Sequence, residues 1–273
     1  MSEISIVTIN ILVDLSLWKK RRLLLLDQLI DLNPDIIALQ EVSLKGKVST
    51  AHWIASELNQ KITEEEHQYQ VFLCPKTGQF SDQEGIAFLS RLMVKRHETI
   101  DLQTQSRVAQ LIELKLEEGS LLLVNGHFYL EHSESKARKD QVELLLDYLD
   151  TQPAEIPVIV VGDFNSQPDM PTIDLMRRYF DSAYRAVHGV EADHTWPTPL
   201  PASRLDEIRR NILHHFGKED ESEPIWQGTL DYIFVDPRLT TLECRITLDK
   251  PDQEHPHIYP SDHYGIYALI EVN

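Results

Sequence analysis

Several strand-like apolar runs of this chain end in polar side chains of the kinds that bind a cation or a phosphate. The runs IIALQEV, LLLVNGHF and VIVVGDFNSQP all finish in this way. Because strand ends present side chains to a shared cleft, we expect these separate segments to build one site for a hard cation and a phosphate. The residues concerned are Asn10, Gln40, Glu41, Asn125, Gly126, His127, Gly162, Asp163, Phe164, Asn165, Ser261, Asp262 and His263.

Two segments place polar groups directly after a strand. Glu41 is costly to bury unless it is paired or binds a cation, so it is the first candidate metal ligand. A solvated glutamate just outside the sheet is the alternative. Asp163 could bind a cation or orient a nucleophile, and the amide of Asn165 could hold a water or a phosphate oxygen. The alternative for this second segment is an Asx turn that caps the next helix.

The histidine segments suggest acid–base chemistry. His127 and His263 could hold or pass a proton near neutral pH, and an aspartate could orient the ring and stabilise its charged form. Asp262 and His263 point to opposite faces if the chain is extended, so Asp262 need not be that aspartate. Asp231, at the start of a strand-like run, could orient His263, bind a cation or be an ordinary strand-edge residue.

An amphipathic helix pattern after NGHF adds a basic residue. Arg138 and Gln141 are three positions apart and share one helical face. Arg138 could contact the phosphate or support the site from behind. An ion pair at the surface is the ordinary alternative.

The net charge of −18 limits the kind of partner. Proteins that grip long nucleic acid usually neutralise many phosphates with Lys and Arg, whereas this chain as a whole repels a polyanion. The basic run Lys19-Lys20-Arg21-Arg22 is interpreted as the polar start of a helix. We therefore expect no strong polyanion-binding surface, although a small phosphoester or a strand end held by a metal is compatible with the charge.

Cysteine usage and hydropathy favour a cytoplasmic protein. Cys74 and Cys244 have no CxxC spacing and are expected to be reduced structural thiols. The N-terminus lacks the basic and apolar regions of a signal peptide. No apolar run approaches the ~20 residues that span a membrane, so we expect no transmembrane segment.

Strand patterns dominate, and the helix patterns fall into two sets, one in each half of the chain. Helices are predicted at 18–32, 51–60, 133–149 and 172–179, with a further helical patch at 203–216. Strand-like runs lie before, between and after them. Two strand-rich halves with helices outside predict an α/β fold, a four-layer αββα sandwich of two packed, mainly antiparallel sheets.

No boundary divides the chain, so residues 1–273 are expected to form a single domain. Residues 181–227 are the most irregular stretch, and their position before Asp231 suggests an insertion that covers the site and selects the substrate. Tyr184, Trp196 and Trp226 could stack on a base or ring, and core packing is at least as good an explanation.

In their order along the chain, the polar segments resemble the motif set of the endonuclease/exonuclease/phosphatase superfamily, also called the deoxyribonuclease-I-like fold. The matching segments are Asn10, Gln40-Glu41, Asn125-Gly126-His127, Gly162-Asp163-Phe164-Asn165, Asp231-Tyr232-Ile233 and Ser261-Asp262-His263. The resemblance runs from about residue 4 to residue 271. It implies the four-layer sandwich and a Mg²⁺- or Mn²⁺-dependent phosphoester hydrolase of the phosphodiesterase or nuclease type.

The resemblance also implies which residues hold the metal. Glu41 is the main ligand, with Asn10 and Asp262 nearby. Physical chemistry agrees, because Mg²⁺ prefers a few carboxylates together with waters and substrate oxygens. Such an ion polarises a phosphoryl group and positions the attacking water.

The remaining roles follow from the same resemblance. Asp163 orients or activates the attacking water, and Asn165 and His127 hold the phosphate. His263, supported by Asp231, stabilises the charge on the phosphate or acts as the general base. The sequence leaves open whether Asp163 or His263 is that base.

Gly126 departs from the family pattern, which has Thr or Ser before the first histidine. The change removes a hydroxyl and no ligand, so we expect an intact site. The segments HFYLEHS and HTWP look more like the branch of deadenylases, tyrosyl-DNA phosphodiesterases and sphingomyelinases than like abasic-site endonucleases. The substrate stays open between a nucleic-acid end, a nucleotide, and a small or lipid phosphoester for a phosphatase or phospholipase-C-like enzyme. A non-catalytic scaffold of the same fold is the alternative outside the enzymes.

Overall fold

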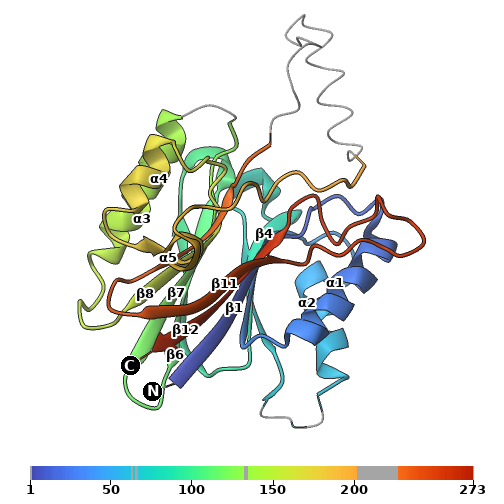
Figure 1. Ribbon diagram of the computed structural model, residues 1–273, viewed down its shortest axis with the longest axis horizontal. Coiled ribbons are helices and arrows are strands. Elements are labelled where there is room, and N and C mark those ends of the chain that lie inside the picture. The colour runs from blue at the N-terminus through green and yellow to red at the C-terminus, as the bar shows by residue number, and fades with distance from the viewer. Residues whose placement is uncertain (1, 63, 65–66, 132–134, 202–226, 273) are drawn as a thin grey trace, which may run out of the picture.

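The computed structural model describes residues 2–62, 64, 67–131, 135–201 and 227–272. They build two six-stranded sheets packed face to face, with helices on both outer faces (Figure 1). The predicted four-layer α/β sandwich is confirmed. The helical patch expected at 203–216 lies outside the described residues.

The first sheet has the strand order β11-β12-β1-β2-β4-β3. Its strands are β1 (Ser2–Asn10), β2 (Ile36–Ser43), β3 (Gln70–Pro75), β4 (Glu84–Ser90), β11 (Thr240–Thr247) and β12 (Gly265–Val272). The central strands β1 and β2 are parallel, and the other neighbours are antiparallel. Helices α1 (Trp18–Leu32) and α2 (Thr50–Asn59) cover the outer face (Figure 1).

The second sheet repeats this plan with the order β5-β6-β7-β8-β10-β9. Its strands are β5 (Val94–Asp101), β6 (Val108–Lys115), β7 (Ser120–His127), β8 (Val158–Asp163), β9 (Asp181–Ser182) and β10 (Asp231–Val235). Again the two central strands, β7 and β8, are the parallel pair. Helices α3 (Lys136–Leu149) and α4 (Pro171–Met176) cover its outer face (Figure 1).

Strand alternation decides which side chains lie between the sheets. In β1, Ile4 and Ile6 belong to the apolar cluster that joins the two sheets, whereas Val7 and Ile9 pack under the helices. Because successive side chains point to opposite faces, the even-numbered Asn10 also lies on the inner face. The same alternation places further polar strand-end residues between the sheets. These are Gln40, Asn125, His127, Asp163 and Asp231.

The topology gathers these polar ends at one end of the sandwich. The parallel pairs β1–β2 and β7–β8 finish there, and the antiparallel neighbours β10 and β12 begin there. Asp231 pairs directly with Asp163, and His127 pairs with Asp163 from the other side. Residues far apart in sequence therefore meet in one place without any loop having to carry them.

The first residues of the stretch 181–227, interpreted above as an insertion, belong to the second sheet and to a helix packed on it. Residues Asp181–Ser182 form β9, which pairs with β10, and α5 (Ala183–His188) packs against β10 and β11. Tyr184 packs against the apolar cluster between the sheets, so core packing accounts for it. Trp226 lies outside the described residues.

Cys74 and Cys244 are free, buried thiols, as predicted. In the part of the chain that the structure describes, no helix has both the length and the apolar character needed to cross a bilayer.

Gly162→Ala is expected to destabilise the protein strongly because β7 and β8 approach closely at this point. Gly162 pairs with Gly126 and has a φ of +134°, and an added Cβ would lie 2.0 Å from the Gly126 carbonyl oxygen. We expect a loss of about 3 kcal/mol or more in the free energy of unfolding, measured with denaturant.

Gly119→Ala is the matched control for this prediction. Gly119 also has a positive φ, +84°, but an added Cβ would meet no atom within 4 Å. We expect this substitution to cost about 1–2 kcal/mol, the usual value for a left-handed backbone. Equal losses in the two variants would contradict a constraint from the close approach of the strands.

Candidate active site

Glu41 lies at an irregular position of β2. The pairing of β2 with β4 shifts between Leu39 and Val42, and Glu41 has a φ of 54°. Its Oε2 accepts a hydrogen bond from the Val13 N–H at 2.9 Å, and its Oε1 accepts one from Asn10 Nδ2 at 3.1 Å. Burial raises the pKa of Glu41, but these two hydrogen bonds help to lower the pKa overall, so the carboxylate is ionised at neutral pH.

Asn10 joins Glu41 to the second sheet. Its Nδ2 also donates to Asp163 Oδ2 at 3.1 Å, so one amide contacts a carboxylate from each sheet. Asp163 Oδ1 accepts from the Asn165 N–H at 2.8 Å, which forms an Asx turn, but this turn caps no helix because α4 begins only at Pro171. Burial, followed by the negative charge of Asp231, raises the pKa of Asp163 to about 7.

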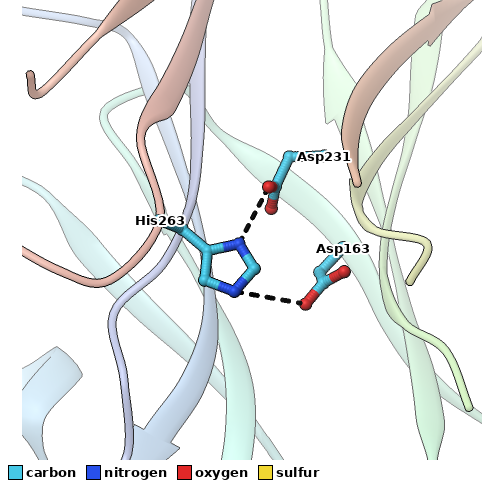
Figure 2. A group of neighbouring side chains, drawn as sticks. All are labelled: Asp163, Asp231 and His263. Atoms are coloured by element: carbon cyan, nitrogen blue, oxygen red, sulfur yellow. Dashed lines mark hydrogen bonds and ion pairs between the residues drawn. The ribbon is translucent and has the colours of Figure 1, made fainter. Parts of the chain in front are cut away.

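The ring of His263 lies between Asp231 and Asp163 and is held by Asp231 (Figure 2). Its Nδ1 donates to Asp231 Oδ2 at 2.9 Å, and its Nε2 lies 4.0 Å from Asp163 Oδ2. Burial lowers the pKa of His263, but the adjacent Asp231 charge and hydrogen bond help raise the pKa to about 10. The imidazole therefore carries a positive charge at neutral pH and offers an Nε2–H toward the site.

His127 differs electrically from His263. Its Nε2 lies 3.5 Å from Asp163 Oδ2, and the side chain is buried. Burial together with the positive charges of Arg107 and Lys76 holds the pKa of His127 well below the ordinary value. The site therefore contains one neutral and one cationic imidazole, both facing Asp163.

Asn165 completes the group around Asp163. It is buried with a φ of 48°, and its Nδ2 donates to the Phe128 carbonyl oxygen at 3.1 Å. The structure thus brings Asn165 beside His127 and Asp163 at the ends of β7 and β8. Because its Nδ2 is engaged by the backbone, the side-chain oxygen and the second amide hydrogen remain for a ligand.

Asp262 lies next to the Asn10 and Glu41 pair. The hydroxyl of Ser261 donates to the Asn10 carbonyl oxygen at 2.6 Å and fixes this segment to the end of β1. Burial, together with the negative charge of Glu41, raises the pKa of Asp262. Neighbouring half-buried carboxylates of like charge, with an amide beside them, form an oxygen-rich group that a hard divalent cation would neutralise.

A second set of metal-type ligands has a different explanation. Among the described residues, Asp163, Asp231 and His263 bring three ligand atoms within 4.8 Å of one another. His263 keeps its proton at neutral pH and uses Nδ1 for Asp231, whereas a metal requires a neutral imidazole nitrogen. In the absence of a metal ion, the group is therefore an oriented imidazolium between two aspartates.

The structure corrects the phosphate-binding interpretation of Arg138. This residue is fully buried in α3, and its Nη1 donates to the carbonyl oxygens of Tyr129 and Glu131 at 3.5 and 2.8 Å. Gln141 on the same face accepts from the Tyr129 N–H at 2.8 Å and donates to the Thr104 carbonyl oxygen at 3.0 Å. Among the described residues, this face supports the loops around His127 from behind, so Arg138 is better assigned to that role than to phosphate binding.

Gln40 and Asn125 also lie outside the reacting group. Gln40 Nε2 donates to Asn125 Oδ1 at 2.7 Å and to Thr8 Oγ1 at 3.0 Å. Asn125 Nδ2 donates to the carbonyl oxygens of Leu39 and Ala87 at 3.1 and 3.2 Å. These motif residues tie the two sheets together beneath the site.

Thr195 is a site residue that the sequence analysis missed. Its hydroxyl donates to Asp231 Oδ2 at 2.6 Å and accepts from the N–H groups of Leu230 and Asp231. The next residue, Trp196, donates from Nε1 to Asp262 Oδ2 at 3.4 Å. The HTWP segment, noted above as a feature of one branch, was the signal that could have identified Thr195.

Arg21 was misinterpreted from the sequence as part of a polar helix start. It is fully buried, whereas Lys19 and Lys20 are exposed. Its guanidinium donates to four backbone carbonyl oxygens at 2.7 to 3.2 Å. These belong to Ile11, Leu12, Asp14 and Pro260. Arg21 therefore ties the loop that binds Glu41 to the segment that leads into Asp262.

Phe128 explains the glycine at the position where the family has Thr or Ser. A Cβ on Gly126 would lie 2.5 Å from the Phe128 ring. This ring stacks on Phe164 with their centroids 4.5 Å apart. The aromatic pair therefore takes the space that a side chain at position 126 would need.

A two-sheet sandwich that gathers carboxylates, amides and imidazoles at one end defines the deoxyribonuclease-I-like class of folds. The model of the endonuclease/exonuclease/phosphatase family matches residues 7–263. The chain belongs to this family, whose members hydrolyse phosphoester bonds.

Relatives and solved structures agree with this assignment. The Kluyveromyces lactis CCR4-Not complex 3'-5'-exoribonuclease subunit Ccr4 is 24% identical over 94% of this chain and 38% of that protein. Xenopus laevis Nocturnin is 24% identical over 94% of this chain and 65% of that protein. The chain spans 37% to 65% of the lengths of the four curated relatives it matches.

Solved structures show the same fold at low identity. D. rerio TDP2, humanised by 14 mutations, superposes with a TM-score of 0.72 at 18% identity, with full coverage of both chains. The human Nocturnin catalytic domain with bound sulfate gives a TM-score of 0.69 at 23% identity, covering 99% of this chain and 95% of that one.

Arg21→Met is expected to cost about 3–5 kcal/mol in the free energy of unfolding, because buried carbonyl oxygens lose a charged donor. Lys20→Met, one position away and exposed, is the control and should change stability by about 0.5 kcal/mol or less. Denaturant unfolding measures both. Similar small effects in the two variants would contradict the structural role of Arg21.

Asp231→Asn is expected to lower the pKa of His263 from about 10 toward the ordinary histidine value of 6.5. The raised pKa of His263 in the folded state stabilises the wild type below pH 6.5, and that stabilisation is lost as the pH rises through about 10. The stability advantage of wild type over Asp231→Asn should therefore shrink by about 1.4 kcal/mol per pH unit across this window.

Unfolding in EDTA at several pH values, with NMR titration of the His263 ring, measures this effect. A constant difference in stability between wild type and variant from about pH 6 to pH 10 would contradict an Asp231-stabilised imidazolium.

Proposed function

We propose that the protein is a Mg²⁺- or Mn²⁺-dependent phosphodiesterase that cleaves phosphoester bonds in nucleotide-containing substrates. The observation that carries the proposal is the shared Asn10 amide, which places the ionised Glu41 of one sheet beside Asp163 of the other. A cation site and a water-activating carboxylate are then neighbours. A scaffold would gain nothing from burying these charges together.

The oxygen donors of Glu41, Asn10 and Asp262 would hold the cation. The half-buried carboxylates of Glu41 and Asp262 repel each other, and a bound cation removes that repulsion. When bound, Mg²⁺ or Mn²⁺ polarises the phosphoryl group. The Val13 N–H and the Asn10 amide keep the Glu41 carboxylate fixed for this purpose.

The remaining groups serve the phosphate and the attacking water. Asp163 has its Oδ1 fixed by the Asn165 N–H, so its Oδ2 is oriented to accept a proton from a water. His263 uses Nδ1 for Asp231, so its Nε2–H is directed at the negative charge that develops on the phosphate. Neutral His127 and the Asn165 amide position the phosphate oxygens.

Relatives guide the choice of substrate. One is named as a 3'-5'-exoribonuclease subunit, and D. rerio TDP2 has been solved with a single-strand DNA product. The charge of −18 disfavours long polyanions but not a strand end or a dinucleotide. We therefore favour a short nucleotide phosphodiester over a lipid or a phosphomonoester as the substrate. We also propose that the protein works in the reducing environment of the cytoplasm.

Metal-dependent hydrolysis of bis-p-nitrophenyl phosphate tests the proposed function. We expect turnover with Mn²⁺ or Mg²⁺, none in EDTA, and weaker turnover of the monoester p-nitrophenyl phosphate. Glu41→Gln should reduce kcat/KM by about a hundredfold or more, because it removes the charge that binds the cation.

A metal-dependent shift of the thermal midpoint gives a readout that does not need a substrate. Wild type should be stabilised by Mn²⁺, whereas Glu41→Gln should lose the shift while remaining folded in EDTA. Glu118→Gln, in the exposed β6–β7 turn, is the control and should behave as wild type. Equal Mn²⁺ shifts in wild type and Glu41→Gln would overturn the metal assignment.

A further inference from the structure

Two basic residues, one buried and one largely buried, lie beside the reacting group and have no role in the proposed function. Arg107 precedes β6 and is 7% exposed, and the side chain of Lys76, just after β3, is 10% exposed. The two are near each other, because the Thr77 N–H donates to the Ser106 carbonyl oxygen at 3.2 Å. Burying two like charges together is costly unless anions balance them.

Protein groups balance this pair incompletely. Lys76 forms a close ion pair with Glu84. Among the described residues, neither Nε nor Nη1 of Arg107 has a hydrogen-bond partner, although both atoms are buried. His127 Nδ1 is likewise buried without a hydrogen bond and lies 3.9 Å from Glu84 Oε1. Unpaired guanidinium donors in a buried position are the arrangement that binds a phosphate.

The turn that carries Arg107 is built with backbone strain. Gln103, Gln105 and Ser106 all have positive φ values between 54° and 66°. Gln141 of α3 donates to the Thr104 carbonyl oxygen within this turn at 3.0 Å. Strained residues persist where the surrounding structure holds them, so the position of Arg107 is fixed by the fold.

Strand order separates this pair from the reacting imidazolium. His263 precedes β12 and Asp231 begins β10, on one side of the central parallel strands. On the other side, Lys76 follows β3, Glu84 begins β4, and Arg107 precedes β6. The charge of Arg107 nevertheless reaches the site, because it contributes to lowering the pKa of Glu41 and of His127. Arg107 and Lys76 therefore lie next to the reacting groups but are not among them.

We propose that Arg107 and Lys76 form a second anion-binding subsite, which takes a phosphate adjacent to the one that is hydrolysed. The inference rests on the proposed function and narrows it to substrates with two neighbouring phosphates, such as a phosphorylated dinucleotide. A lipid or choline phosphodiester, with a single phosphate, leaves the subsite empty.

Steady-state hydrolysis of TpT, pTpT and TpTp with Mn²⁺ tests the subsite. We expect wild type to prefer one of the two terminally phosphorylated dinucleotides over TpT by about tenfold or more in kcat/KM, the effect of one charge-assisted hydrogen bond. Arg107→Met should lose this preference. Arg245→Met, which removes an exposed arginine from the edge strand β11, should keep it.

Two results would overturn the subsite. One is a wild-type enzyme that hydrolyses the three dinucleotides equally well. The other is an Arg107→Met enzyme that keeps the wild-type preference. If Arg107→Met does not fold, Lys76→Met provides the same comparison with the same expected loss.

A binding measurement separates failure of the subsite from failure of the proposed function. If no dinucleotide is hydrolysed, the proposed phosphodiesterase activity is wrong, and calorimetric titration of the metal-free protein with pyrophosphate tests the subsite alone. Arg107→Met should then bind pyrophosphate at least about tenfold more weakly than wild type and Arg245→Met. Equal affinities would overturn the subsite.

Discussion

The hydrogen bonds of the Asn10 amide are the interaction on which the site depends. One Nδ2 group donates at 3.1 Å to Glu41 of the first sheet and to Asp163 of the second. An amide can serve two buried carboxylates in this way without adding a charge of its own. Packing of the two sheets therefore also sets the spacing of the reactive groups, so the core and the site cannot be separated energetically.

The seam between the sheets is polar at the site and apolar elsewhere, and this contrast decides the electrostatics. Burial between the packed sheets raises the pKa of Asp163, whereas direct hydrogen bonds keep the Glu41 carboxylate ionised. The two histidines diverge for the same reason, because Asp231 accompanies His263 while positive groups accompany His127. The two histidine side chains thus differ in charge, one neutral and one cationic, because their neighbours differ.

Strand periodicity made the fold and much of the site predictable. Once Ile4 and Ile6 are assigned to the inner face, Asn10 must also lie on that face, because alternate residues of a strand share a face. The same alternation places Asp163 and Asp231 on the inner face. Sequence could not reveal that Arg21 and Arg138 are fully buried, since both stand in helices among charged residues. Their partners are backbone carbonyl oxygens of loops, including the distant Pro260 for Arg21, which leave no mark in the pattern of side chains.

Arg107 and Lys76 escaped prediction because single basic residues near strand ends are usually exposed. Their burial matters because the chain as a whole has a net charge of −18. Long-range repulsion from that charge discourages long polyanions, while two desolvated cations beside the reacting group attract an anion strongly at short range. A protein with this combination selects by local charge rather than by a basic surface. The proposed subsite therefore suits a small substrate with few phosphates, which would have to enter the seam to be bound.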